Sequence, residues 1–221
     1  MKQTPIHEGH NPDLLEMIPA GTRRVIEVGC SSGALARAFK QTGDAHWVGV
    51  EIDPAYAEVA EQHCDYLEVE NIEHCDSDFY RKYADRDCWV FGDCLEHLQD
   101  PWQVLSSIRA VIPRDGTVVA CIPNAQHWSL VIKQALGAFF YEDSGLLDRT
   151  HLRWFSRLTM TQLFESQGFK ITTLKPRIFD EPARETFLPS IHHIAQTAGV
   201  DPETVLRDSL PLQYVLCANP A

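Results

Sequence analysis

Short apolar runs rich in β-branched residues alternate along the chain with longer stretches in which apolar positions repeat at helical spacing. This alternation is typical of an α/β fold in which helices cover both faces of a mostly parallel sheet. Seven runs predict strands, at residues 24–28, 47–51, 66–69, 88–92, 117–122, 170–174 and 213–217. Four stretches predict helices, at residues 33–41, 54–63, 101–112 and 157–167. We therefore expect a doubly wound, seven-stranded sheet.

Two of the predicted helices carry signals at their ends. Asp100 before Pro101 is typical of an N-cap followed by a first-turn proline, and Gln103 is expected to return the capping hydrogen bond. Gly168 stands where the helix at residues 157–167 should end.

Two segments interrupt the alternation of strands and helices. Residues 123–155 are expected to form an insertion over a cofactor cleft, and residues 184–206 a helical insert before the last strand. No internal repeat, low-complexity tract or long linker divides the chain. A chain of this length suits one hydrophobic core, so residues 1–221 are expected to form a single domain.

Glycines follow the first predicted strand directly. The segment Glu27-Val-Gly-Cys-Ser-Ser-Gly33 places an acid at the end of the strand and glycines at the start of a helix. In such folds ligands bind beyond the carboxyl ends of the strands, where glycine lets the backbone approach and the helix N-terminus favours an anionic group. Glu51 ends the second strand 22 residues after Gly29, about the interval at which a carboxylate meets ribose hydroxyls. These features predict a nucleoside cofactor.

A dinucleotide is the alternative cofactor. Ser31 stands where the central glycine of the dinucleotide pattern would allow backbone to approach a pyrophosphate. An NAD-dependent oxidoreductase is therefore the weaker hypothesis.

At four places in order along the chain, residues resemble the motifs of class I S-adenosylmethionine-dependent methyltransferases. The matching segments are residues 27–33, 49–53, 69–73 and 92–101, within a resemblance that spans about residues 12–217. The resemblance implies a Rossmann-like sheet of seven strands whose last strand runs antiparallel. It also implies that the cofactor contacts Glu27, Gly29, Cys30, Gly33, Glu51, Ile52, Asn71, Ile72 and Asp93.

The chain departs from the family pattern at two of these motifs. Ser31 replaces a glycine, and Asn71 stands where many members carry an aspartate. An asparagine amide can still bind the edge of adenine. Residues 122–128 and 145–155 are similar to a bacterial subgroup often linked to glycan or secondary-metabolite modification.

Two histidines are the candidate catalytic residues. S-Adenosylmethionine carries the difficult chemistry, so the protein must align the acceptor and, for a hydroxyl, remove its proton. His97 follows the fourth strand and His151 lies in the insertion, and imidazole titrates near neutral pH. His127 beside Trp128 is a third choice, more often a packing residue than a base.

A divalent cation is a further hypothesis for this region. Asp93, Glu96 and His97, completed by His151, offer mixed oxygen and nitrogen ligands and resemble the arrangement in ubiquinone-biosynthesis and small-RNA O-methyltransferases. The alternative is that Asp93 contacts the cofactor while Glu96 pairs with an arginine such as Arg149 or Arg153.

Composition and net charge limit the classes of binding partner that we expect. The formal net charge of −12 disfavours nucleic acid and anionic membranes as partners. The seven cysteines form no C-x-x-C pair, so reduced core thiols and a cytoplasmic location are expected, and no N-terminal run resembles a signal peptide. Oligomeric state has no signature in the sequence.

The sequence as a whole predicts methyl transfer from S-adenosylmethionine to a small-molecule or glycan acceptor, with a hydroxyl oxygen favoured. The alternatives are an N-methyltransferase and a cofactor-binding regulatory module without turnover. Six aromatic residues are expected to line an acceptor pocket or to pack in a lid: Trp128, Phe139, Phe140, Tyr141, Trp154 and Phe155.

Overall fold

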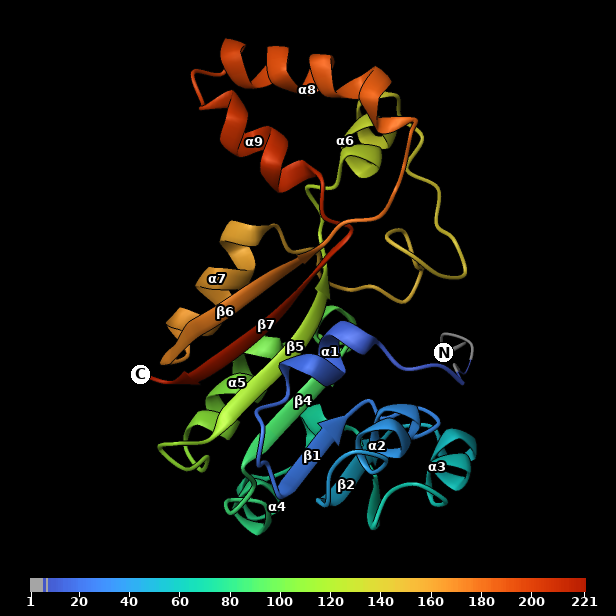
Figure 1. The fold of residues 1–221 in the computed structure, drawn as a ribbon, viewed down its shortest axis with the longest axis vertical. Coiled ribbons are helices and arrows are strands. Elements are labelled where there is room, and N and C mark those ends of the chain that lie inside the picture. Colours follow the sequence, from blue (N-terminus) through green and yellow to red (C-terminus); the bar gives the residue numbers. More distant parts are fainter. Residues whose placement is uncertain (1–5, 7) are drawn as a thin grey trace.

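The computed structural model describes residue 6 and residues 8–221, and its centre is one seven-stranded sheet (Figure 1). The strand order is β3-β2-β1-β4-β5-β7-β6. Strand β7 pairs antiparallel with both β5 and β6, while β1 to β5 pair in parallel, as predicted. The bounds of the strands are β1 (Arg24–Val28), β2 (His46–Glu51), β3 (Tyr66–Val69), β4 (Cys88–Gly92), β5 (Thr117–Pro123), β6 (Phe169–Arg177) and β7 (Gln213–Pro220).

Strands β1, β3 and β4 have the predicted bounds, whereas β6 and β7 are longer than predicted. These two strands pair from Phe169 opposite Pro220 to Arg177 opposite Gln213, with an irregularity near Ile171. Their ends contain lysine, proline and arginine, and β6 is only partly buried. A buried apolar run therefore marks only the middle of this antiparallel pair.

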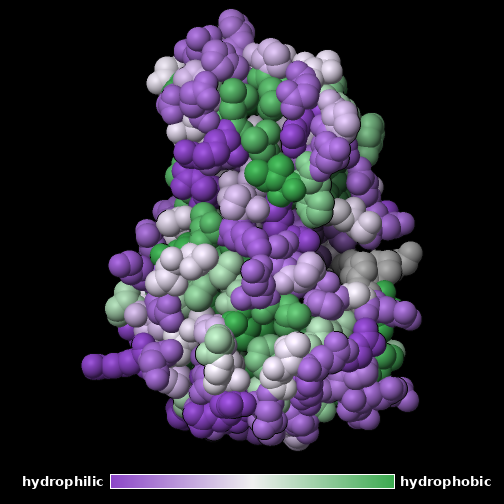
Figure 2. All heavy atoms as spheres, viewed as in Figure 1, coloured by the Kyte–Doolittle hydropathy of each residue, from purple (hydrophilic) through white to green (hydrophobic). Residues whose placement is uncertain are grey.

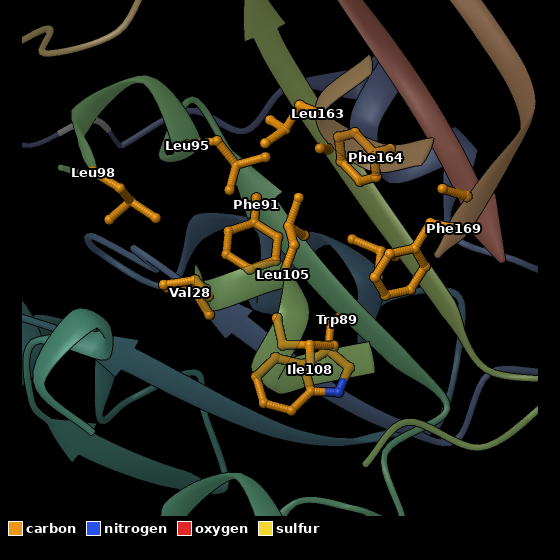
Figure 3. Packing of buried hydrophobic residues seen from close by; sticks show 14 of the residues in the cluster. Val28, Trp89, Phe91, Leu95, Leu98, Leu105, Ile108, Leu163, Phe164 and Phe169 are labelled. Carbon is orange, nitrogen blue, oxygen red and sulfur yellow. The ribbon is translucent and has the colours of Figure 1, made fainter. Parts of the chain in front are cut away.

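Helices cover both faces of the sheet, and each face has its own core. One core packs α4 (Ser77–Lys82), α5 (Pro101–Arg109) and α7 (Arg157–Ser166) on the sheet. Its largest side chains include Trp89 and Phe91, both fully buried (Figure 3). Full burial of such a side chain stabilises the fold by roughly 1.5–3 kcal/mol.

The opposite core packs α1 (Pro12–Met17) and α2 (Ala34–Phe39) on the sheet, and α3 (Pro54–Ala60) contacts β2 and β3. The predicted helices beginning at residues 33, 54, 101 and 157 all exist, with ends one to three residues shorter at the C-terminal side. Helices α1 and α4, of six residues each, were not predicted.

The predicted helix ends are largely confirmed. The Asp100 carboxylate accepts from the N–H of Gln103 at 2.9 Å, and Gly168 has a φ of 77° after α7. The reciprocal bond expected from Gln103 is wrong: its side chain donates to Ser107, and the N–H of Asp100 donates to Glu73 instead. Glu73 follows the third strand and lies outside the sequence of this helix, so the helix pattern alone does not reveal it as the partner of Asp100.

Three helices form a lobe beyond the carboxyl end of β5 (Figure 1). They are α6 (Trp128–Ala135), α8 (Arg184–Thr197) and α9 (Pro202–Ser209). The predicted insert at residues 184–206 is therefore a helix pair, whereas most of the first insertion is irregular. Figure 2 shows apolar side chains gathered between helices of this lobe and polar side chains around them.

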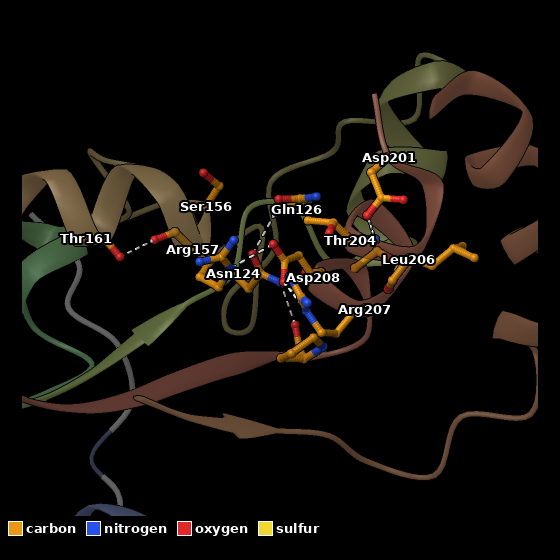
Figure 4. A network of polar contacts seen from close by, with 12 residues as sticks. Asn124, Gln126, Ser156, Arg157, Thr161, Asp201, Thr204, Leu206, Arg207 and Asp208 are labelled. Atoms are coloured by element: carbon orange, nitrogen blue, oxygen red, sulfur yellow. Dashed lines mark hydrogen bonds and ion pairs between the residues drawn. The ribbon is translucent and has the colours of Figure 1, made fainter. Parts of the chain in front are cut away.

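A buried polar network joins the lobe to the sheet (Figure 4). The amide of Asn124, at the end of β5, donates to the carbonyl oxygens of Asp208 and Pro211, both at 2.8 Å. Arg157 at the start of α7 binds the Asp208 carboxylate at 2.7 Å. Asp208 is only 3% exposed, so its charge is buried together with its partner.

Within the described part of the chain, every helix is too short or too polar to cross a lipid bilayer.

Candidate functional site

The loop between β1 and α2 is shaped by backbone that only glycine adopts easily. Gly29 and Gly33 have φ angles of 73° and 71°, and Ser31 between them has 49°. A Cβ on Gly29 would lie 3.2 Å from the sulfur of Cys94, and one on Gly33 would lie 3.1 Å from His63. The loop is therefore pressed between the segment after β4 and the end of α3.

Two buried carboxylates lie beside this loop, as the sequence predicts. Glu51 at the tip of β2 accepts from the N–H of Ser31 at 2.8 Å and from the N–H of Asp53 at 3.0 Å. Glu27 near the tip of β1 accepts from the indole N–H of Trp47 at 3.0 Å. Burial, followed by the nearby Cys64, raises the pKa of Glu27 well above its usual range, and the Glu51 charge adds to this.

The indole partner of Glu27 is a residue that sequence reasoning missed. In the sequence, Trp47 is recognisable only as a strand residue, and the residue opposite it on β1 is Val25. No local signal links it to Glu27, which lies 20 residues earlier.

Three more cofactor candidates lie at the ends of β2 and β3. Ile52 is 55% exposed, whereas Ile72 is buried in the core. The side-chain oxygen of Asn71 accepts from the N–H of Glu73 at 3.0 Å and caps the short helix η1 (Ile72–His74). The cap fixes the orientation of the Asn71 amide. Ile52 provides an exposed apolar side chain at the end of β2.

Asp93 follows β4 in a left-handed conformation, with a φ of 51° that is uncommon for a residue other than glycine. Its N–H donates to the carbonyl oxygen of Cys121, and its carboxylate accepts from the side chain of Gln213 on β7. Asp93 is therefore tied to the tip of β5 and to β7.

Glu96, His97 and His151 form a compact cluster. One ligand atom from each lies within 4.8 Å of the others, while Asp93 is outside this group. Glu96 is 1% exposed, and neither of its carboxylate oxygens accepts a hydrogen bond within the described residues. Burial, and then the charge of Asp93, raises its pKa well above the usual range.

The expected pairing of Glu96 with an arginine is wrong. Arg149 pairs with Asp143 at 2.8 Å, and Arg153 donates to the carbonyl oxygens of Leu152 and Gln99. It is the backbone of Glu96 that holds this segment, because its carbonyl oxygen accepts from the N–H groups of Leu152 and Arg153 at 2.8 and 3.0 Å. These bonds bring His151 to η2 (Leu95–His97).

Thr150 fixes the proton position on His97. The Nδ1 atom of His97 lies 3.2 Å from the Thr150 carbonyl oxygen and 3.0 Å from its hydroxyl, which donates to Asp148 at 2.7 Å. A carbonyl oxygen can only accept, so Nδ1 carries the proton and Nε2 keeps its lone pair. Asp148 and Thr150 were not predicted because they lie more than 50 residues after His97.

Both histidines are neutral at neutral pH. Burial lowers the pKa of His97, and burial followed by the charge of His97 lowers the pKa of His151 to about 4. His151 also hydrogen-bonds the backbone of Leu146. A neutral imidazole with one nitrogen held by backbone can accept a proton or bind a metal ion through the other.

His127, the third candidate, has a different environment. Its Nε2 atom lies 3.0 Å from Glu181 and its Nδ1 atom 2.8 Å from Ser129. Trp128 donates to the same Glu181 carboxylate and stacks on Phe187 of α8. These contacts join α6 to the start of the α8 region.

The predicted aromatic set divides in two. Phe155 is buried in the core, and Trp128 packs in the lobe. Three of the others meet, since Phe139 contacts the rings of Tyr141 and Trp154. Phe140 is 73% exposed.

Comparison with known proteins places this geometry in a family. The model of a family described as "Methyltransferase domain" matches residues 10–174, from α1 into β6. The chain belongs to this methyltransferase family. The match includes the glycine loop, both strand-tip acids and the cluster of Glu96, His97 and His151.

The methyltransferase is 29% identical over 143 residues to a ubiquinone biosynthesis O-methyltransferase of Histophilus somni (strain 2336). That match covers 58% of the chain, and the chain spans 59% of the length of the relative. The family match confirms the predicted enzyme class as far as a methyltransferase.

Solved structures share the fold at low sequence identity. A SAM-dependent methyltransferase from Archaeoglobus fulgidus superposes with a TM-score of 0.61 at 19% identity, covering 90% of this chain and 86% of its own. The 1,6-didemethyltoxoflavin-N1-methyltransferase of Burkholderia thailandensis, solved with S-adenosylhomocysteine, gives 0.59 at 14% identity, covering 95% of this chain and 77% of its own. The predicted fold class is confirmed.

Proposed function

We propose that the methyltransferase moves the methyl group of S-adenosylmethionine to a hydroxyl oxygen of a small molecule or glycan. The observation that carries this proposal is the buried cluster of Glu96, His97 and His151, since a hydroxyl must lose its proton and two neutral imidazoles are suited to take it. The O-methyltransferase relative supports an oxygen acceptor.

The proposed cofactor site lies across the tips of β1, β2, β3 and β4. When bound, the cofactor supplies a methyl group activated by a cationic sulfonium. Each oxygen of Glu51 accepts one backbone N–H, and a carboxylate can accept several hydrogen bonds, so we propose that Glu51 also binds the ribose hydroxyls. A nearby cation favours ionisation of Glu27. The residues proposed to hold the cofactor are Glu27, Gly29, Cys30, Gly33, Glu51, Ile52, Asn71, Ile72 and Asp93.

His97 is the proposed base, and His151 is its catalytic neighbour. Because Nδ1 is fixed on Thr150, the Nε2 lone pair is the atom that accepts the acceptor proton. The charge of Asp148 favours the imidazolium that results. The ring centroids of His151 and His97 are 4.8 Å apart, so we propose that His151 binds the same acceptor oxygen.

The same side chains fit a divalent cation. Two neutral imidazoles and a buried carboxylate without hydrogen-bond partners in the described chain form a suitable mixed donor set. When bound, such a cation would lower the pKa of an acceptor hydroxyl. Glu96, His97 and His151 would hold it, and Asp93 would stay with Gln213.

The test combines calorimetry with a transfer assay. We expect S-adenosylhomocysteine to bind, and transfer from S-adenosylmethionine to phenols or sugar hydroxyls in a panel that also contains amines. Transfer to amines alone would contradict the oxygen acceptor. Binding without transfer to any acceptor would favour a regulatory module.

A second experiment tests whether a divalent cation takes part in the transfer. If a cation takes part, chelation by EDTA lowers kcat, Mg²⁺ or Mn²⁺ restores it, and Glu96→Gln lowers kcat without changing cofactor affinity. Activity that survives chelation and is unaltered in Glu96→Gln would exclude the cation and leave His97 as the base.

We also propose that residues 1–221 form one domain, because Asn124 and Asp208 join the lobe to the sheet. A single cooperative unfolding transition is expected, and two separated transitions in calorimetry would contradict it.

A further inference from the structure

Two cysteines from different elements meet beneath the glycine loop. Cys30 lies in that loop and is buried, and Cys64 follows α3 and is partly exposed. A Cβ added to Gly49 on β2 would lie 2.6 Å from the sulfur of Cys30 and 3.1 Å from the sulfur of Cys64. The thiols also hydrogen-bond each other. Glycine at position 49 therefore leaves room for two sulfurs that converge on one point.

The two thiols have unequal surroundings. Cys64 lines a surface hollow of about 430 Å³ together with Arg37, Lys40 and His63. Its hydrogen bond with Cys30, and then the charge of Lys40, lowers the pKa of Cys64. The same bond, and then burial, raises the pKa of Cys30. A thiol with a lowered pKa beside a surface hollow, next to a buried second thiol, has the chemistry of an attacking and a resolving cysteine.

We propose that Cys64 and Cys30 are a peroxide-sensitive pair that closes to a disulfide and thereby weakens binding of the adenosyl cofactor. This inference rests on the proposed cofactor site for its effect on binding. The disulfide itself depends only on the two thiols.

The reaction needs a hydroperoxide as oxidant. The Cys64 thiolate attacks one peroxide oxygen, the O–O bond breaks, and the leaving oxygen takes a proton to become water or an alcohol. Cys64 is then a sulfenic acid. The Cys30 sulfur attacks it, an S–S bond forms, and a second water leaves with the Cys30 proton. Two thiols have lost two electrons, and one peroxide has been reduced.

Disulfide formation would disturb the cofactor loop through short contacts. The Cys30 carbonyl oxygen accepts from the N–H of Gly33 at 2.8 Å, and the Cys30 N–H donates to Val50. Just before Cys64, Ala60 and His63 lie close to Gly33, because a Cβ added to Gly33 would meet them at 3.3 and 3.1 Å. An S–S bond of about 2.05 Å requires the two sulfurs to approach. Because both cysteines belong to segments that touch Gly33, the loop must move.

The experiment treats the full chain with limiting hydrogen peroxide. Mass spectrometry of non-reduced peptides is expected to find Cys30 linked to Cys64. The dissociation constant of S-adenosylhomocysteine, measured by calorimetry, is expected to rise roughly five- to 150-fold, the range of typical coupling between two sites. Dithiothreitol should restore both the thiols and the affinity.

Two variants separate this pair from other thiols. Cys64→Ser is expected to form no such link and to give the same dissociation constant before and after peroxide. Cys75→Ser removes another partly exposed thiol and is expected to keep both the link and the loss of affinity. The wild-type peptide analysis needs neither variant, so it stands even if one of them folds poorly.

Three outcomes decide the proposal. Oxidation of other cysteines without a Cys30–Cys64 link would overturn it, as would a complete link with unchanged affinity. A reduced protein that does not bind S-adenosylhomocysteine would instead refute the proposed cofactor site, while the peptide analysis still decides whether the thiol pair forms a disulfide.

Discussion

The two halves of the site are built from different parts of the chain. The glycine loop and the two acids of the proposed cofactor half lie between residues 27 and 53, where backbone N–H groups donate to the Glu51 carboxylate. The acceptor half joins η2 to a segment 53 residues later, through the bond between His97 and Thr150. The first half is shaped by backbone conformation, and the second by side chains brought together from afar.

The two halves also differ in how they treat a buried acid. Glu51 is 2% exposed and accepts two backbone N–H groups. Glu96 is 1% exposed, and both its oxygens lack hydrogen-bond partners within the described residues. A buried carboxylate without donors is costly to keep ionised. The difference supports the proposed binding role of Glu51 and the proposed chemical role of the cluster around Glu96.

The strongest test of this contrast removes the base. His97→Asn keeps a donor for Thr150 but loses the Nε2 lone pair. We expect kcat to fall roughly 100- to 10,000-fold, the usual contribution of a general base. Cofactor affinity, measured by calorimetry, should stay within about twofold because His97 is outside the cofactor half.

His127→Asn is the matched control for that variant. It breaks contacts to Ser129 and Glu181 and should lower the melting temperature while leaving kcat near the wild-type value. An unchanged kcat in His97→Asn would remove His97 from catalysis.

The second test acts on the cofactor half. Glu51→Ala removes the acceptor of two loop N–H groups and the proposed ribose contacts. We expect the affinity for S-adenosylhomocysteine to fall by about 1 to 3 kcal/mol. Asp53→Ala is the control, because Asp53 caps α3 and should cost about 1 kcal/mol of stability without weakening binding. Equal affinity losses in both variants would contradict a specific role for Glu51.

The third test uses pH to probe the acceptor half. The pKa of His151 is lowered to about 4 in the folded protein from 6.5, so the unfolded state binds more protons between these values. Stability from this group is present above pH 6.5 and is lost as the pH falls toward 4. Between pH 7 and pH 5 the loss is about 2 kcal/mol.

Denaturant unfolding at these two pH values would measure that loss. His151→Asn should show a smaller decrease in the free energy of unfolding than the wild type. The groups that face His151 are His97, which lowers its pKa, and Asp148, which raises it, and both remain in the variant. Equal decreases in the two proteins would contradict a buried neutral His151.

The contrast between the halves also explains what the sequence predicts well. The glycine loop and both acids of the proposed cofactor half lie within one strand-loop-helix-strand stretch, so the interval from Gly29 to Glu51 predicts that the acids lie close together. The acceptor half depends on pairing across some 50 residues. Residue type identifies His97 and His151 as candidates, but it does not reveal Thr150 or Asp148. The predicted arginine partner of Glu96 is wrong, because Arg149 and Arg153 bind other groups.

The smallest effect is expected from Thr150, which acts through His97. Thr150→Val removes the hydroxyl between Asp148 and His97 but keeps the carbonyl oxygen that accepts from Nδ1. Loss of one such bond costs about 1 kcal/mol, so we expect kcat to fall roughly fivefold with KM little changed. The acid limb of the pH profile should also move with the His97 pKa, and Thr150→Ser should restore both kcat and the pH profile. Because Asp148 raises that pKa, a weaker link to it predicts a shift to lower pH. A Thr150→Val enzyme with wild-type kcat and pH profile would show that the carbonyl oxygen alone fixes the His97 tautomer.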